Sequence, residues 1–264
     1  AGLSPWDRSS QADRVFRAVD DISFNLKRGE SLGLVGESGC GKSTTSSIIT
    51  RLINPTSGEI IFDGVNITAY RAESFARRPE RKKIQMVFQD PTESLNPRYS
   101  AYDCIGEPLR RLLRYRNRKL IRSKVEALAE RVGLPEELLG RFPHQLSGGQ
   151  KARVGIARAI AVDPTLLILD EPTSALDVSV QAVVLQLLNR LKYELGMSYI
   201  FVSHDLNVVR LLCERVVVMN RGKIVEQGAA DDVLRKPSDP YTRALVDAIP
   251  HLELEKVQCA PLVK

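Results

Sequence analysis

The sequence contains no apolar run that approaches the ~18–20 residues needed for a membrane-spanning helix. Its first residues also lack the basic segment followed by an apolar segment that marks a secretory signal. Cysteine is scarce, with 4 in 264 residues and none spaced as Cys-x-x-Cys, so neither a disulfide framework nor a zinc site is indicated. We therefore expect a chain that stays in the cytoplasm unless a partner holds it at a membrane.

Acidic residues are outnumbered, 32 against 38 basic ones, which gives a formal net charge of +6. The basic residues concentrate in two runs, at 77–83 and 110–119. Nucleic acid, an anionic membrane surface or no specific partner could each account for this charge, and such runs most often form a solvated helix face. With 43% hydrophobic and 27% charged residues, the composition is that of an ordinary globular protein.

Short apolar segments alternate with longer segments of helical periodicity, which predicts an α/β fold with a mostly parallel sheet. Apolar strands are expected at 18–26, 32–35, 165–170 and 198–203, a short strand pair at 57–64 and a hairpin at 215–228. Residues 100–160 have a helical pattern, and an amphipathic helix at 178–195 should end at Gly196. Residues 1–14 are polar and predict a loop.

A glycine-rich loop follows the strand at 32–35 and matches GxxxxGK[ST] between a strand and a helix, the context in which this pattern binds nucleotide phosphates. Its amides would surround the phosphates, Lys42 would be a solvent-facing charge aimed at the γ-phosphate, and the Ser43 hydroxyl would bind Mg²⁺. The nucleotide-binding candidates here are Gly36, Glu37, Ser38, Gly39, Cys40, Gly41, Lys42, Ser43 and Thr44.

Polar side chains follow three further apolar segments, and parallel strands deliver such residues to one crevice. Asp170 is expected near Mg²⁺, and Glu171 is placed to polarise the water that attacks the γ-phosphate. His204 is a candidate for contact with the γ-phosphate, and Gln89 for binding Mg²⁺ or orienting water. A structural histidine and a plain surface glutamine are the alternative interpretations.

A second phosphate-reading element lies in Leu146-Ser147-Gly148-Gly149-Gln150, just before another helical pattern. The phosphate loop, Gln89, this five-residue signature, Asp170-Glu171, the segment 174–177 and His204 occur in the order seen in ATP-binding subunits of ABC transporters, which the chain resembles. "VGESGCGKST", "MVFQDPTESLNPR", "SALDVSVQA", "SHDLNVV" and "DPYTRALVDAIP" resemble the oligopeptide/dipeptide importer subgroup.

This resemblance implies one nucleotide-binding domain over residues 1–264. Its parts would be a P-loop NTPase (RecA-like) core, an antiparallel β subdomain, an α-helical signature subdomain at about 100–160 and a C-terminal importer-type tail at 229–264. It also implies that two such domains meet head to tail, with the signature residues Ser147, Gly148, Gly149 and Gln150 acting on the partner's ATP. Phe16 is the candidate for stacking on adenine, and Trp6 is the other aromatic residue considered.

The function implied is ATP hydrolysis that drives uptake of oligopeptides, dipeptides or related small solutes, with ATP and Mg²⁺ as cofactors. The expected partners are transmembrane permease subunits, a second ATPase domain, identical or related, and indirectly a solute-binding protein, at the cytoplasmic face of the inner membrane. The alternative is a soluble ABC-type ATPase acting on nucleic acid or ribosomes, which the basic charge would suit. A regulatory module without turnover is a third interpretation, against which Glu171 argues. The sequence names neither the solute nor the second ATPase.

Overall fold

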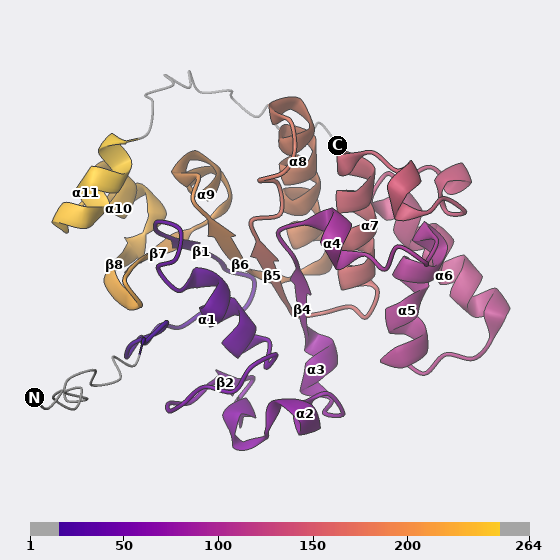
Figure 1. The fold of residues 1–264 in the computed structure, drawn as a ribbon, viewed down its shortest axis with the longest axis horizontal. Coiled ribbons are helices and arrows are strands. Elements are labelled where there is room, and N and C mark those ends of the chain that lie inside the picture. The colour runs from indigo at the N-terminus through magenta and orange to yellow at the C-terminus, as the bar shows by residue number, and fades with distance from the viewer. Residues whose placement is uncertain (1–15, 249–264) are drawn as a thin grey trace, which may run out of the picture.

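The computed structural model describes residues 16–248 of the chain (Figure 1). The expected loop at 1–14, Trp6 and the end of the 229–264 tail lie outside these residues. Within the described range the α/β class is confirmed, because helices connect the strands of a largely parallel sheet. In the same range, none of the helices combines the length and the apolar character that a bilayer crossing requires.

The central sheet has six strands in the order β4-β5-β6-β1-β7-β8. Neighbours pair in parallel from β4 to β7, and β8 is antiparallel to β7. Every residue of β1, β5 and β6 is buried, which explains their nearly continuous apolar sequences. The strands are β1 (Ser31–Val35), β4 (Ile84–Val87), β5 (Leu166–Asp170), β6 (Ser198–Ser203), β7 (Arg215–Asn220) and β8 (Lys223–Ala229).

Helices cover the sheet and extend beyond it. Helices α5, α6 and α7 pack on one another beside β4 and fill the region expected to be helical (Figure 1). The predicted amphipathic helix is α8, and it ends at Gly196 in the left-handed conformation. The helices are α1 (Lys42–Ile49), α2 (Ala72–Phe75), α3 (Glu80–Lys83), α4 (Pro91–Ser94), α5 (Ala101–Arg111), α6 (Arg118–Arg131), α7 (Gly148–Ile160), α8 (Val178–Leu195), α9 (Leu206–Leu212), α10 (Ala230–Arg235) and α11 (Pro240–Asp247). Single 3₁₀ turns lie at η1 (Ile67–Ala69), η2 (Glu136–Leu138) and η3 (Pro143–Gln145).

A separate antiparallel pair consists of β2 (Ile61–Phe62) and β3 (Val65–Asn66), so the second strand falls just beyond the expected 57–64 segment. The strand expected at 18–26 is wrong. Ile22, Phe24 and Leu26 do pack against a hydrophobic core, as their alternation predicts. No strand among the described residues pairs with this segment, however, and a strand requires a neighbour to take its hydrogen bonds.

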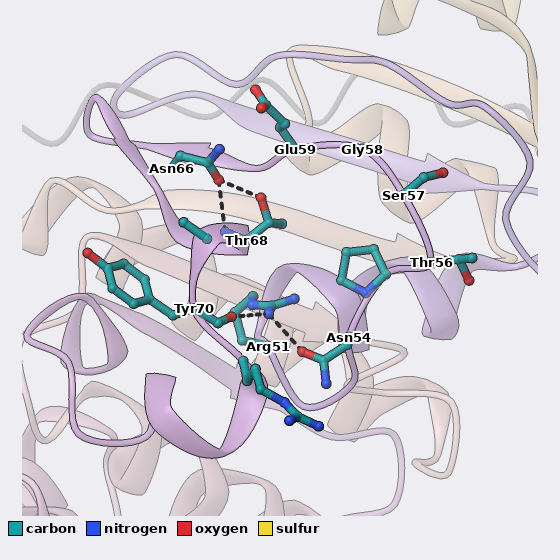
Figure 2. Close-up of a pocket in the computed structure, with 12 residues that line it drawn as sticks. Arg51, Asn54, Thr56, Ser57, Gly58, Glu59, Asn66, Thr68 and Tyr70 are labelled. Atoms are coloured by element: carbon teal, nitrogen blue, oxygen red, sulfur yellow. Dashed lines mark hydrogen bonds between the residues drawn. The ribbon is translucent and has the colours of Figure 1, made fainter.

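Arg51 joins the end of α1 to the small β part of the molecule. Its side chain is buried, and its guanidinium donates to the Asn54 Oδ1 at 2.9 Å and to the Tyr70 carbonyl (Figure 2). Burial lowers the pKa of Arg51. Arg51, Asn54 and Tyr70 line a hollow of about 360 Å³, together with residues of the loop after α1, the end of β3, the turn η1 and Arg71 (Figure 2). Arg51 thus acts as a structural bracket for this part of the fold.

A buried ammonium lies at the opposite end of β1 from the glycine-rich loop. Lys192 of α8 is only 4% exposed, and its Nζ donates to the Glu214 carboxylate and, at 2.8 Å, to the Ser31 hydroxyl. The Glu214 carboxylate also accepts a hydrogen bond from the Ser31 amide at 2.6 Å. This cluster fixes α8 to the starts of β1 and β7.

The substitution Glu214→Gln should lower the free energy of unfolding by about 2 kcal/mol, because it leaves the Lys192 ammonium buried without a counter-charge. Adding Lys192→Met should recover most of this loss in urea unfolding experiments. Glu194→Gln is the matched control, since it breaks the exposed Arg190–Glu194 pair of 3.5 Å and should cost at most about 0.5 kcal/mol. Equal losses for the two Glu→Gln variants would show that burial of the Lys192 ammonium does not decide the stability of this cluster.

Candidate nucleotide-binding and catalytic site

The glycine-rich loop connects the buried strand β1 to α1, and its backbone requires glycine at two positions. Gly36 and Gly41 have φ angles of 147° and 108°. A Cβ atom on Gly36 would lie 2.1 Å from the Met219 carbonyl oxygen, and one on Gly41 would lie 2.3 Å from that of Ala18. No side chain caps the N-terminus of α1, so its first amides are available to an anion.

Lys42 is not the solvent-facing charge that the sequence suggested. Its side chain is 5% exposed, and its Nζ donates to the Gly36 carbonyl at 2.7 Å and to the Glu37 carbonyl at 2.8 Å. The buried Cys40 Sγ lies 3.7 Å from the same nitrogen. The loop carbonyls satisfy the ammonium because a buried charge without hydrogen bonds would be costly. Lys42 therefore braces the loop from inside.

Ser43 and Asp170 meet where α1 begins and β5 ends. The Ser43 hydroxyl donates to Asp170 Oδ1 at 3.3 Å, and Asp170 is 6% exposed. Burial raises the pKa of Asp170 and the neighbouring Glu171 raises it further, while Ser43 and Lys42 oppose this shift. A hydroxyl and a buried carboxylate are hard oxygen ligands, and a divalent cation would stabilise the charged form of Asp170. The residues present therefore fit Mg²⁺.

Glu171, Gln89 and His204 come together although they follow three different strands. Gln89 Nε2 donates to Glu171 Oε2 at 3.0 Å, and His204 Nδ1 lies 3.2 Å from Glu171 Oε1. Glu171 has a positive φ of 44°, a conformation that few non-glycine residues adopt. Its amide donates to the Val202 carbonyl at 3.0 Å, which holds the strained turn in place. The carboxylate is thus oriented by one group on each oxygen.

The signature begins α7 with a capping box. Ser147 Oγ accepts from the Gln150 amide, and Gln150 Oε1 accepts from the Ser147 amide at 2.9 Å. Gly149 packs closely on the start of α8, where a Cβ atom would lie 2.6 Å from Val180 Cγ1. Packing therefore favours glycine at this position, independently of any phosphate contact. Within the described range, no hydrogen bond joins the signature (146–150) to the phosphate loop (36–44).

Two contacts between α7 and α4 lie outside the motifs, and the sequence did not predict them. Lys151 Nζ donates to Thr92 Oγ1 at 3.1 Å, and Arg158 Nη1 donates to the Ser94 carbonyl at 2.6 Å. Burial lowers the pKa of Arg158. These bonds connect the signature helix to the segment that follows Gln89, and no local pattern in the sequence marks the pairing.

Two more features surround the phosphate loop. The Glu37 amide donates to the Tyr241 hydroxyl at 2.9 Å, a contact that nothing in the loop sequence predicts. Phe16 is 82% exposed and lies two residues before Ala18, whose carbonyl packs against Gly41. Phe16 is therefore exposed and close in sequence to a residue that contacts the loop, while its contact with adenine stays a prediction.

A glycine-rich loop between β1 and α1, whose Ser43 meets an acidic residue at the end of the parallel strand β5, two places away from β1 in the sheet, defines a P-loop nucleotide-binding protein. The family model described as "ABC transporter" matches residues 19–174, and that described as "Oligopeptide/dipeptide transporter, C-terminal region" matches residues 225–261. The chain belongs to the ABC transporter family, as an ATP-hydrolysing subunit.

Curated relatives and solved structures agree with this assignment. The chain is 48% identical over 234 residues to the oligopeptide transport ATP-binding protein OppF of Bacillus subtilis, covering 89% of this chain and 76% of the relative. It is 45% identical over 240 residues to the dipeptide transport ATP-binding protein DppF of Escherichia coli, and the match covers 91% of this chain and 71% of the relative. A dimeric post-hydrolysis structure of the ATP-binding cassette MJ0796 with ADP and Pi is similar in fold, with a TM-score of 0.72 and 33% identity. The match covers 81% of this chain and 90% of that one.

Lys42→Ala should weaken ATP binding about 10- to 100-fold, because it removes a charge-assisted contact to phosphate. It should also lower the free energy of unfolding by about 1 kcal/mol, since the Gly36 and Glu37 carbonyls lose their donor. Titration with a fluorescent ATP analogue and urea unfolding measure the two effects. Lys124→Ala, on the exposed face of α6, is the control. Unchanged ATP affinity in Lys42→Ala would contradict the assigned role.

Proposed function

We propose that this chain hydrolyses ATP at a shared dimer interface and thereby drives import of oligopeptides, dipeptides or related small solutes. The observation that carries the proposal is the Glu171 carboxylate, held between Gln89 and His204 beside the Asp170–Ser43 pair. The names of the relatives and the match of residues 225–261 to a peptide-transporter region support the substrate class. An ATPase acting on nucleic acid or ribosomes is not favoured by these relatives, and we expect no nucleic-acid partner.

The phosphate loop (residues 36–44) and the first turn of α1 bind the phosphates through those of their backbone amides that have no acceptor within the protein. Lys42 exchanges its loop carbonyls for phosphate oxygens when ATP enters. Ser43, Asp170 and Gln89 would hold Mg²⁺, which would neutralise charge on the phosphates. Phe16 is the proposed stacking partner for adenine.

Hydrolysis requires a base beside the γ-phosphate, and Glu171 fills that role by polarising the attacking water. Its two carboxylate oxygens are already oriented by Gln89 and His204, so little reorganisation is needed. The His204 ring is proposed to contact the γ-phosphate as well. The lack of a hydrogen bond between phosphate loop and signature in the described range supports a site completed by a second domain, whose Ser147, Gly148, Gly149 and Gln150 approach this ATP.

We infer that residues 1–264 form one nucleotide-binding domain, with a helical subdomain at about 100–160 and an importer-type tail at 229–264. The mutual packing of α5, α6 and α7 supports the first division. The domain would work peripherally, at the cytoplasmic face of the inner membrane, with permease subunits, a second identical or related ATPase domain and indirectly a solute-binding protein. The bonds from α7 to α4 offer a route by which changes at Gln89 reach the signature.

Glu171→Gln should bind ATP without cleaving it and form an ATP-dependent dimer, because the variant keeps the shape of the site and loses the base. Size-exclusion chromatography with light scattering, with and without Mg-ATP, measures the dimer. Adding Ser147→Arg should give monomers that carry ATP, since the long side chain occupies the position of the neighbour's phosphate.

Ser147 also caps α7, so the matched control for that experiment is Ser147→Ala in the Glu171→Gln background. It costs about 1 kcal/mol of helix capping without adding bulk, and it should still dimerise. All variants are also measured after addition of the second ATPase subunit of the same transporter, because the natural dimer can consist of two different ATPase domains. A Ser147→Arg variant that dimerises as readily as Glu171→Gln alone would contradict the shared site.

Import itself is tested by reconstituting the chain in liposomes with the permease pair and solute-binding protein encoded by neighbouring genes. Adding di- and oligopeptides with the binding protein should stimulate ATP hydrolysis and carry labelled peptide into the vesicles, because substrate binding closes the ATPase interface. Glu171→Gln should abolish uptake in the same preparation. Stimulation by DNA or ribosomes in place of peptide would overturn the importer assignment.

A further inference from the structure

The C-terminal tail contacts the phosphate loop through one side chain. Tyr241, in the first turn of α11, accepts a hydrogen bond of 2.9 Å from the backbone amide of Glu37, 204 residues earlier. Its ring packs against the larger hydrophobic core, and α11 lies beyond β8 at the end of the sheet (Figure 1). The tail therefore reaches the nucleotide loop from an element that contributes no residue to the phosphate, magnesium or hydrolysis candidates.

Both backbone polar groups of Glu37, which belong to successive peptide units, are hydrogen-bonded. Its N–H group donates to Tyr241, and its carbonyl accepts from the Lys42 ammonium at 2.8 Å. Glu37 follows Gly36, where the chain leaves β1 with a φ that suits only glycine. Fixing both backbone groups of Glu37 sets the direction in which the loop starts. The orientation of the loop amides that follow depends on that direction.

A carboxylate on β8 holds α11 in position. Glu226 accepts hydrogen bonds from the Ser238 amide at 2.9 Å, the Ser238 hydroxyl at 2.6 Å and the Asp239 amide at 3.1 Å. Burial acts to raise the pKa of Glu226, but the bonds from Ser238 and its neighbours outweigh it and lower the pKa to about 2. Asp239 then caps α11 through the Tyr241 and Thr242 amides. The hydroxyl of Tyr241 is thus placed by a charged clamp that stays ionised at neutral pH.

We propose that Tyr241 is a positioning residue of the phosphate loop, and that docking of α11 by Glu226 sets the affinity for ATP. This inference rests on the proposed binding of ATP by that loop. Burial raises the pKa of Tyr241, so the phenol stays neutral while its oxygen accepts the hydrogen bond from the Glu37 amide. The tail thereby tunes nucleotide binding without touching the groups that cleave ATP.

The first test is Tyr241→Phe, which keeps the ring and removes only the hydroxyl acceptor. The dissociation constant and KM for Mg-ATP should rise about fivefold, the effect of one hydrogen bond, with kcat unchanged. Tyr193→Phe is the matched control, because Tyr193 is 72% exposed on α8 and should leave both constants unaltered. An unchanged ATP affinity in Tyr241→Phe would overturn the proposal.

The second test separates docking of the tail from folding. Glu226→Ala should reproduce the loss of ATP affinity, and combining it with Tyr241→Phe should add nothing, because both changes break the same connection. Urea unfolding of each variant shows whether the whole fold is weakened. Additive losses, or a fall in kcat parallel to the loss of stability, would overturn the coupling. Failure of the unaltered chain to bind Mg-ATP would instead refute the proposed function.

Discussion

Parallel pairing among β4, β5, β6 and β1 is the constraint on which the whole site depends. The register places Asp170 beside Val202 and Val35 beside Ser203, so these strands finish almost level with one another. Each segment that follows a strand therefore emerges at the same edge of the sheet. If one of these strands ran the other way, its polar residue would lie at the far edge, away from the others. The residues brought to this edge are Gly36, Gln89, Glu171 and His204.

Charged side chains are concentrated at this edge of the sheet, and their mutual repulsion and burial reduce the stability of the fold. Asp170 and Glu171 are adjacent carboxylates, and burial of Asp170 raises its pKa. The Lys42 ammonium offsets this only in part, because it is committed to carbonyls of its own loop. Such an arrangement keeps ligand-binding groups in place before a ligand arrives, and reorganisation during the reaction is correspondingly small. The left-handed turn at Glu171 is a further sign that local stability is given up for orientation.

The features that could be predicted from the sequence are those that depend on residues close together along the chain. The spacing of Gly36, Gly41 and Lys42 is local, and apolar runs ending in polar residues identified three strand ends correctly. The direction of the Lys42 side chain could not be predicted, because it depends on how the loop carbonyls curl around it. Alternation at 18–26 predicted which side chains are buried, but pairing requires a partner strand that periodicity does not reveal. Tyr241 was missed for the same reason, since its place beside the loop depends on how α11 packs on β8.

The close contact between Gly149 and Val180 bears on how related sequences are interpreted. A side chain at position 149 would force the Val180 side chain, in the first turn of α8, to shift whether or not ATP is ever cleaved. A related chain without a carboxylate at position 171 would therefore still have a packing reason to keep this glycine. Glycine at this position is thus no evidence that a related chain hydrolyses ATP.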